Sequence, residues 1–347
     1  MKFCRRAVTV LSLLLSLLSC RKEGNVIYID PDEDTELPDL VYFVTRKGAL
    51  GDVGYMDDMY RGAVRGAQDC GLLFSLVELP SDTLKAVSTI EYMLDYMQNE
   101  EPERRALIIL ANDSLEPLLH RYDALLTRAS NVDFLLAESD DTTLSAHTLK
   151  ILQYGIYYQA GRLVADGLDD VNEILIASAN PDIPGLDGMT GGFSAAIEDS
   201  GSGSELTSIC FSQTTGGYDD ASTAYKMSYS LDGKFDLVLP LCGGTAQGFF
   251  RYNRENPGSF YTLGVDCDMQ LYSPRVPFSI VKHIGDAVQD WICDWWGGEQ
   301  MPSHQVLDLS SGYSELVVSD SFGERLRALA GRYYDKALEE ERKNAGL

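Results

Sequence analysis

Apolar runs typical of β-strands alternate with amphipathic segments along most of the chain. In the first half, strands are expected at 40–45, 72–79, 105–111 and 132–137, with helices at 57–70, 82–97 and 115–127. In the second half, strands are expected at 173–179, 206–213, 235–241 and 259–264, with helices at 188–199, 219–231 and 245–253. Near-continuous apolar strands between helices indicate parallel sheets covered on both faces. Two such runs predict an α/β fold with two doubly wound parallel-sheet lobes.

The C-terminal third adds two helical patterns. Residues 322–344 carry leucine, tyrosine and alanine on one side and mixed charge on the other, which predicts a helix packed on the body. Trp291, Trp295 and Trp296 recur at helical spacing and are expected on a buried or interdomain helix face, with an exposed partner site as the alternative.

The first twenty residues have the pattern of a secretory signal. A basic start is followed by an apolar run over 7–18 that is too short to span a bilayer, and then by Ser19 and Cys20. The ending Leu17-Leu18-Ser19-Cys20 resembles the bacterial lipobox, in which the cysteine becomes the lipidated, palmitate-bearing first residue. An ordinary signal or a buried helix is the alternative, and the lack of acidic residues before Glu23 argues against the buried helix.

The domain boundaries follow from these patterns. We expect a lipoprotein signal peptide at 1–19 and an acidic tether at 20–37. Lobe 1 should comprise 38–143 plus about 267–302, and lobe 2 should comprise 144–266 plus about 303–347. A multi-segment hinge is expected near 139–147, 266–274 and 301–310, so the chain should pass between the lobes more than once.

Charge and composition narrow the function. The 347 residues include 28 Lys+Arg and 53 Asp+Glu, a net charge of −25, so nucleic acid is excluded as a partner. Four scattered histidines and seven cysteines without CxxC spacing predict no metal site, no cofactor and no disulfide framework, although a single disulfide stays open. No GxSxG motif or carboxylate pair after a strand indicates catalysis, so no catalytic residue and no enzyme is predicted.

Ligands of doubly wound folds collect where the strands end. The positions after the expected strands carry RKGALGDVGYMDD from 46 to 58, Asn112-Asp113, Gly243-Gly244-Thr245 and Gly264-Val265-Asp266. Neither GxxxxGK[ST] nor GxGxxG is present, so these glycines are not a phosphate loop.

Five segments in order carry a family resemblance. They are GDVGYMDDMYRGAVRGAQDCG, YYQAGRLVADGL, GMTGGFSAAI, LCGGTAQGFF and LGVDCDMQLYSPRVPFSIVKHIGDAV. Together they resemble the basic membrane protein family of nucleoside-binding lipoproteins over about residues 40–300. The resemblance implies a type I periplasmic binding protein fold, a lipid-anchored protein of the bacterial cell envelope, and an ABC-type importer as partner.

The resemblance also implies binding residues. Asp266 and Lys282 match the aspartate and lysine that contact ribose hydroxyls, and Phe193 matches an aromatic that stacks on the base. Asp113 matches an acid that reads the purine edge, and the glycines 243 and 244 line the cleft. A carboxylate suits two adjacent hydroxyls because it accepts hydrogen bonds from both.

One motif departs from the family pattern. Asp52 and Tyr55 match a segment in which the aspartate is usually followed by Ser-Phe-Asn, but here Val-Gly-Tyr-Met follows. Tyr55 can still stack on a base, whereas the asparagine's polar contact is lost at Met56. The identity of the ligand is therefore left open.

Structural roles are the alternatives at each position. Asp266 could cap a turn, Asp113 could cap a helix, and Phe193 could belong to the core. Lys282 lies near a helix start, where a cation is unfavourable for the helix dipole, so a structural role is less natural there. The leading prediction is a binding protein that captures a nucleoside, with purines favoured, or a similar small polar ligand. The alternative is a surface sensor or assembly lipoprotein that binds a different ligand or none.

Overall fold

The computed structural model describes residues 37–111, 115–139, 141–183, 185–214 and 216–347. Residues 38–347 form one compact unit. The predicted signal peptide, the lipidation site Cys20 and all of the tether but Leu37 lie outside the described residues. None of the described helices combines the length and the apolar character needed to cross a membrane.

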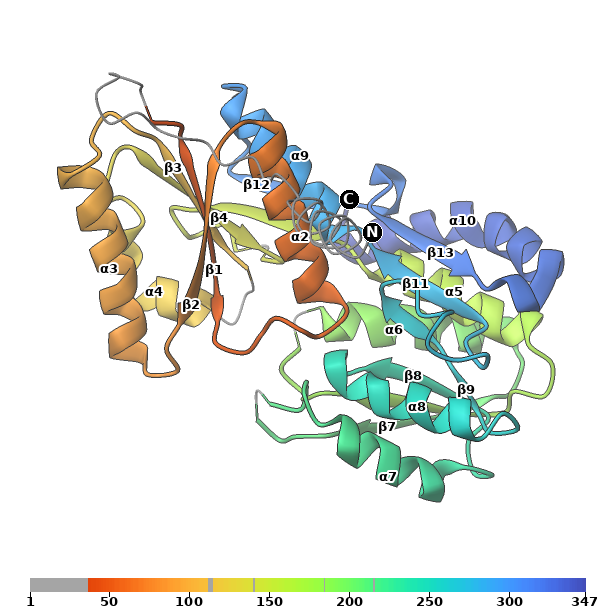
Figure 1. Ribbon diagram of the computed structural model, residues 1–347. Coiled ribbons are helices and arrows are strands. Elements are labelled where there is room, and N and C mark those ends of the chain that lie inside the picture. The colour runs from red at the N-terminus through yellow and green to blue at the C-terminus, as the bar shows by residue number, and fades with distance from the viewer. Residues whose placement is uncertain (1–36, 112–114, 140, 184, 215) are drawn as a thin grey trace, which may run out of the picture. The chain divides into compact units, whose positions relative to one another are not determined.

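A six-stranded sheet forms the first lobe (Figure 1). Its strands are β1 (Leu40–Arg46), β2 (Leu73–Leu79), β3 (Ala106–Leu110), β4 (Val132–Ala137), β5 (His147–Ile151) and β12 (His304–Leu307). They run parallel in the order β12-β5-β4-β3-β1-β2. The chain therefore reverses direction across the sheet between β1 and β3, and ligands of such sheets bind at the carboxyl ends beside this switch point.

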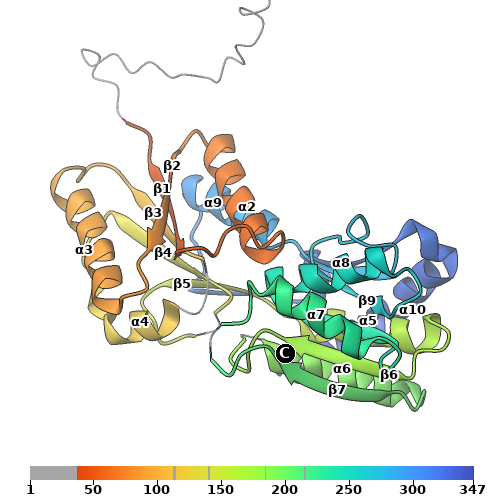
Figure 2. The ribbon, with the colours of Figure 1, turned by 60° about the horizontal axis from the view of Figure 1, so that its bottom comes forward.

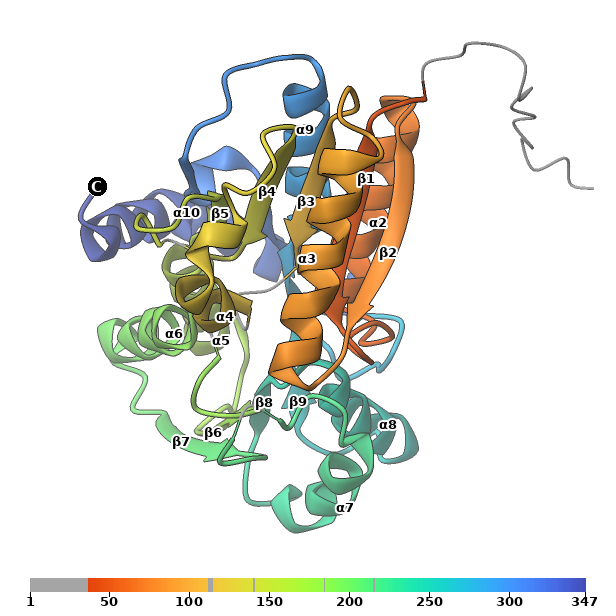
Figure 3. The same cartoon turned by 90° about the vertical axis from the view of Figure 1, so that its left-hand side faces the viewer.

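Helices cover both faces of this sheet because alternate strand residues point to opposite sides. Val41 and Phe43 pack against α2 (Tyr55–Asp69) and α9 (Ile284–Trp296). Leu40 and Val44 pack against α3 (Thr83–Asn99), which Figure 3 shows in front of β1 and β3. α4 (Glu116–Arg121) and η2 (Asp123–Leu125) complete that layer. Three tryptophans of α9 were expected on a buried or interdomain face. Trp291 and Trp295 are buried in this core, and Trp296 is half exposed.

The second lobe has two sheets that share one segment of chain. A parallel sheet in the order β7-β6-β8-β9 contains β6 (Glu173–Ser178), β7 (Glu205–Cys210), β8 (Leu237–Leu241) and β9 (Tyr261–Thr262). A second sheet in the order β10-β11-β13 contains β10 (Gly264–Asp266), β11 (Phe278–Lys282) and the antiparallel β13 (Ser314–Val318). Only Leu263 separates β9 from β10, so the sheets are continuous through this segment.

Helices again cover both sides of the second lobe. One core holds α5 (Tyr154–Gly167), α6 (Leu186–Ser200) and α10 (Gly323–Ala345), with η4 (Leu309–Ser311) and η5 (Asp320–Phe322) beside them. The other core holds α7 (Ala221–Leu231) and α8 (Gln247–Glu255), which lie next to each other in Figure 2. η3 (Gly243–Ala246) leads directly into α8 and contacts α7. The prediction of a two-lobed, doubly wound α/β fold is confirmed.

The lobes exchange chain at positions that differ from the sequence-based boundaries. Residues 147–151 and 304–307 were assigned to lobe 2, but as β5 and β12 they extend the sheet of lobe 1. Residues 278–282 were assigned to lobe 1, but as β11 they pair with β10 and β13 in lobe 2. β5 and β12 are short and half polar, so their sequences do not show the apolar pattern that predicts a strand. The two strands that pair with β11 come from distant parts of the sequence and can be identified only in the folded chain.

Candidate functional site

Loops from both lobes meet at the carboxyl ends of β1, β8, β10 and β11. A methyl group placed on Gly54, in the loop after β1, would lie 3.7 Å from Cβ of Asp266 at the end of β10. One placed on Gly244, after β8, would lie 3.7 Å from Cα of Asp52. The structure therefore brings together six of the predicted site residues: Asp52, Tyr55, Gly243, Gly244, Asp266 and Lys282.

Lys282 is buried at the end of β11 and carries the positive charge of the site. Its Nζ donates a hydrogen bond of 2.8 Å to Oε2 of Glu138, which follows β4 in the other lobe. The same Nζ lies 5.1 Å from the ring centroid of Tyr55, within the range of a cation–π contact. This ion pair thus links the two lobes beside an aromatic ring.

Asp266 is the most perturbed carboxylate of the site. Burial raises its pKa from 3.8 to about 6, and the negative charges of Asp52, Glu138 and Asp58 act in the same direction against the lowering effect of Lys282. It also lies near the fully buried Tyr157, whose pKa is raised by burial and by the charge of Asp266. A carboxyl group of this kind changes charge near neutral pH.

Backbone strain is concentrated around this site. Among the described residues, four non-glycine residues have a left-handed φ: Val53 at 57°, Glu138 at 62°, Asp170 at 61° and Asp266 at 65°. All except Asp170 belong to the loops that meet here. Such conformations are unfavourable for L-residues and collect where function requires a fixed side-chain direction, so they are evidence for the site that does not depend on the resemblance.

Asp52 serves the local structure. Its Oδ2 accepts a hydrogen bond of 2.9 Å from the amide of Met56, and its Oδ1 accepts hydrogen bonds from the amides of Gly54 and Asp57. Asp57 in turn accepts from the amides of Gly51 and Val53. Both oxygens of Asp52 therefore hold the start of α2, which positions Tyr55 as the first residue of that helix.

The predicted glycines allow a close approach after β8. Gly243 has a left-handed φ of 51°, and a methyl group on it would come 3.3 Å from the ring of Tyr218. The hydroxyl of Thr245 donates to the carbonyl of Gly217 and accepts from the amide of Asp220, so the two loops are tied together. Tyr218 is 40% exposed and is an aromatic neighbour of the site that the sequence did not single out.

Two predicted residues do not join this group. Phe193 is fully buried in the core between α5 and α6, in line with the structural alternative for it. The glycine before it serves this packing, because a methyl group on Gly192 would come 2.2 Å from the carbonyl oxygen of Tyr154. Asp113 lies outside the described residues.

Glu138 is the charged residue of the site that sequence reasoning missed. It follows β4 directly, as Asp266 ends β10, so the rule of inspecting positions after strands would have found it. Glu138 is bonded to Lys282, and Asp52 and Asp266 lie close enough for their charges to interact, so the described part of the site carries more negative than positive charge. It therefore disfavours anionic ligands such as phosphates and favours neutral or cationic ligands rich in hydroxyl or NH groups.

The space between these loops is narrow in this structure. Asp52 and Gly54 of lobe 1 and Pro240, Gly243 and Asp266 of lobe 2 line a hollow of about 10 Å³, which is the size of one water molecule. A larger solute can enter only if the two groups of loops move apart. The chain passes between the lobes at several hinge segments, and a rotation about these segments would move the lobes apart.

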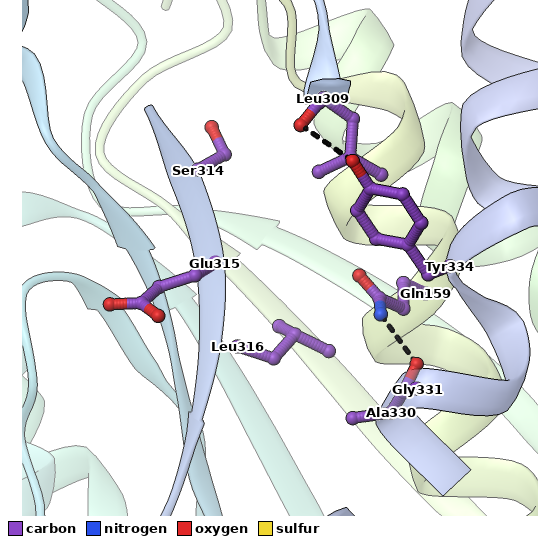
Figure 4. A pocket seen from close by; sticks show the side chains of 8 residues that line it. All are labelled: Gln159, Leu309, Ser314, Glu315, Leu316, Ala330, Gly331 and Tyr334. Atoms are coloured by element: carbon purple, nitrogen blue, oxygen red, sulfur yellow. Dashed lines mark hydrogen bonds between the residues drawn. The ribbon is translucent and has the colours of Figure 1, made fainter. Parts of the chain in front are cut away.

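A larger cavity of about 340 Å³ lies within lobe 2, away from the predicted site (Figure 4). It lies between α5, α10 and β13, and two of its polar side chains bond to backbone carbonyls of its own lining, whereas the buried hydroxyl of Ser314 has no hydrogen-bond partner. Gln159 donates to the carbonyl of Ala330, and the Tyr334 hydroxyl donates to that of Leu309. In Figure 4 the carboxylate of Glu315 points away from these residues. None of the predicted site residues lines this cavity, and Glu315 is the one charged residue among the described residues that do, so the cavity is a weaker candidate.

One group of described residues could hold a metal ion. Glu116, His120 and Asp141 each place a ligand atom within 4.8 Å of the others. Nε2 of His120 already contacts a carboxylate oxygen of Asp141, and Glu116 accepts a hydrogen bond of 2.7 Å from Ser139. These internal bonds account for the cluster without an ion.

Comparison with known proteins gives a fold and no family. No family model and no curated protein matches the chain, so the resemblance to nucleoside-binding lipoproteins stays a prediction. Among solved structures, an ABC transporter solute-binding protein from Aeropyrum pernix matches with a TM-score of 0.67 and 18% identity, over 89% of this chain and 91% of that chain.

Two further structures show the range of proteins with this fold. A carbohydrate transporter solute-binding protein from Agrobacterium radiobacter, in complex with D-arabinose, matches with a TM-score of 0.58 and 16% identity, over 85% of this chain and all of that chain. A transcriptional activator of the comK gene from Bacillus halodurans matches with a TM-score of 0.62 and 16% identity, over 85% and 97%. The chain has the two-lobed α/β fold of type I periplasmic binding proteins.

Proposed function

We propose that this protein is a solute-binding protein that captures a small polar ligand between its two lobes. The observation that carries the proposal is the meeting of Asp266, Lys282, Glu138 and Tyr55 at the carboxyl ends of strands from both lobes. The strained backbone of Glu138 and Asp266 supports it, since strain persists where a side chain must keep a fixed direction.

The chemistry of the site favours a nucleoside or a related sugar-containing ligand. Asp266 can accept hydrogen bonds from two vicinal hydroxyls, while Lys282 can donate to a ring or hydroxyl oxygen. Tyr55 offers an aromatic face for a base, and Tyr218 is placed to replace Phe193 as a second aromatic. The excess of carboxylates disfavours a phosphate on the same ligand.

The N-terminal features extend the proposal to the cell envelope. A signal peptide at 1–19 and lipidation at Cys20 would hold the protein at a bacterial membrane, where it would deliver its solute to an ABC-type permease. The similarity of the fold to ABC transporter solute-binding proteins supports this role. Labelling of cells with a radioactive fatty acid tests the anchor, and Cys20→Ala should remove the label from this protein.

The narrow hollow supports one alternative, a sensor of the same fold that binds a different ligand or none. Asp52 is fully used by the helix start, and Lys282 already has Glu138 as a partner. The fold also occurs in a transcriptional activator.

Thermal unfolding of the full chain in mild detergent distinguishes these functions. We would measure the midpoint with purine and pyrimidine nucleosides, free bases, ribose and other sugars. A ligand at about 100 times its Kd stabilises the folded state by about 2.7 kcal/mol, which raises the midpoint by several degrees. Asp266→Asn should reduce that rise, because the charge that strengthens the bonds to hydroxyls is lost.

Asp170→Asn is the matched control. Asp170 has the same left-handed backbone as Asp266 but is exposed on a turn of lobe 2, so its variant should keep the full rise. If no compound in the panel raises the midpoint and no ligand is released from the denatured protein in mass spectrometry, nucleoside binding is ruled out. The sensor then becomes the better explanation.

A further inference from the structure

Helices α2 and α9 pack unusually closely along one seam of lobe 1. A methyl group on Gly62 would come 1.9 Å from the carbonyl oxygen of Gly285, and one on Gly66 would come 3.2 Å from Cα of Gln289. Both contacts join residues 223 positions apart (285 − 62 and 289 − 66). The helices therefore run in the same direction, side by side, as Figures 1 and 2 show.

The next position of this register holds two cysteines. Cys70 directly follows α2 as its C-terminal capping residue, and Cys293 lies about one turn before the end of α9, so the two are again 223 residues apart. Their sulfur atoms are 3.0 Å apart, which is closer than two unbonded sulfur atoms usually approach and about 1 Å longer than a disulfide bond.

Polar contacts beside the seam fix the register that brings the sulfurs together. Arg65 donates to Gln289 at 2.7 Å and to Asp286 at 2.6 Å, and Gln289 donates to Asp69 at 2.7 Å. The thiols therefore do not meet by rotation of free side chains on a loose surface. The close packing of the two helices, which cannot slide along each other, holds the two thiols face to face.

We infer that Cys70 and Cys293 form a disulfide that joins the first and last helices of lobe 1. The oxidant is a disulfide compound, either an oxidised protein dithiol or glutathione disulfide. One thiolate attacks a sulfur of the oxidant, and the second then attacks the mixed disulfide. The protein gains one S–S bond, and its two electrons and two protons leave on the two thiols of the reduced oxidant.

The bond should form as the helices dock. Burial and the contact with Cys70 raise the pKa of Cys293 to about 12, so the attacking thiolate is scarce once lobe 1 has folded. Cys210, Cys242 and Cys267 belong to lobe 2 and lie outside this seam. All five cysteines of the described residues, Cys70 and Cys293 included, are free thiols in this structure, so the disulfide is the proposed oxidised state of a pair that is already in contact. The pairing is therefore specific to the α2–α9 seam.

The bond would also affect the candidate site. Tyr55 is the first residue of α2, and Lys282 lies just before α9. The amide of Gly285 donates to Oδ2 of Asp58 at 2.9 Å, so the amino ends of the two helices are already joined. A disulfide at their carboxyl ends would fix both ends of the pair that carries these two residues.

Oxidative refolding tests the inference. The full chain is unfolded with a reductant, refolded in detergent with a glutathione redox buffer, denatured, and treated with a maleimide polymer that adds a visible mass to each free thiol. Two thiols should be protected, and peptide mapping should find Cys70 joined to Cys293. Cys70→Ser and Cys293→Ser should each leave no protected thiol, while the matched control Cys210→Ser keeps both protected.

Thermal unfolding provides an independent reading. A disulfide that closes a loop of this length should raise the midpoint by about 5 °C or more relative to the reduced protein. That difference should vanish in Cys70→Ser and persist in Cys210→Ser. Full labelling of both cysteines in refolded protein with a native circular dichroism spectrum, or a linkage of either to another cysteine, would overturn the inference.

Discussion

At the scale of single residues, the carboxylate of Asp266 carries a cost in stability. Its pKa of about 6 in the folded protein exceeds the ordinary 3.8, so the folded state holds more protons between these values than the unfolded state does. The free energy of unfolding should therefore fall as pH rises from about 4 to 6 and stay at its lower level above pH 6. This cost is the one expected of a carboxylate kept for binding, as proposed above.

Replacing this charge should stabilise the protein without ligand. Asp266→Asn keeps a residue type that accepts a left-handed φ and removes the buried charge, so we expect a gain of roughly 1–3 kcal/mol at pH 7. Chemical denaturation at pH 4 and pH 7 measures it, and the gain should largely disappear at pH 4. Asp170→Asn should change stability little at either pH, and an equal gain there would show that the backbone, rather than the charge, is responsible.

Single residues also mark the limit of sequence reasoning at the site. Asp266 and Lys282 could be named because short motifs surround them. Glu138 has no motif, although its place after β4 was sufficient to find it. Phe193 follows a Gly-Gly pair that could equally serve a ligand or a helix contact, and only the position of α5 shows that it serves the contact.

At the scale of elements, glycines in helices have opposite roles that depend on what faces them. Gly62 faces the carbonyl of Gly285 at a distance that leaves no room for a side chain. Gly331 lies in α10 with nothing within 4 Å of an added methyl group. Replacing each glycine by alanine therefore distinguishes the effect of helix packing, at Gly62, from the effect of helix propensity, at Gly331.

We expect Gly62→Ala to lower the free energy of unfolding by at least about 1 kcal/mol, since the helices must move apart to admit the methyl group. Gly331→Ala should raise it by up to about 1 kcal/mol because alanine is the better helix former. Denaturant titrations followed by circular dichroism measure both. A neutral Gly62→Ala would show that α2 and α9 are free to separate.

Three of the strands that the sequence predicted share a physical property. β1, β3 and β8 are buried along their whole length or nearly so, and a strand covered on both faces must be apolar throughout. β5, β12 and β13 are half polar and short, so their sequences cannot be distinguished from those of loops. They become strands because they extend sheets that other segments have already formed.

At the scale of the whole molecule, the net charge of −25 acts in the same direction as the selectivity proposed for the site. Carboxylates around Lys282 and a negative surface both repel a phosphate. If a nucleoside binds, its 5′-monophosphate should bind about tenfold or more weakly, because two charges a few ångströms apart near a protein surface interact by more than 1 kcal/mol. Calorimetric titration of both compounds at two salt concentrations measures the difference. Stronger binding of the monophosphate would show that the ligand's charge is neutralised by groups other than Lys282.

The path of the chain through lobe 1 has a consequence for biosynthesis. The sheet of this lobe begins at β1, near residue 40, and is completed only by β12, at residues 304–307. At the usual rates of translation, tens of seconds separate the synthesis of these two strands. During that time the nascent chain lacks α9 and β12 and cannot close its first core. A chain of this topology reaches its stable form only after most of it has left the ribosome. If the protein is exported as proposed, this delay keeps the chain unfolded while it is threaded through a narrow channel.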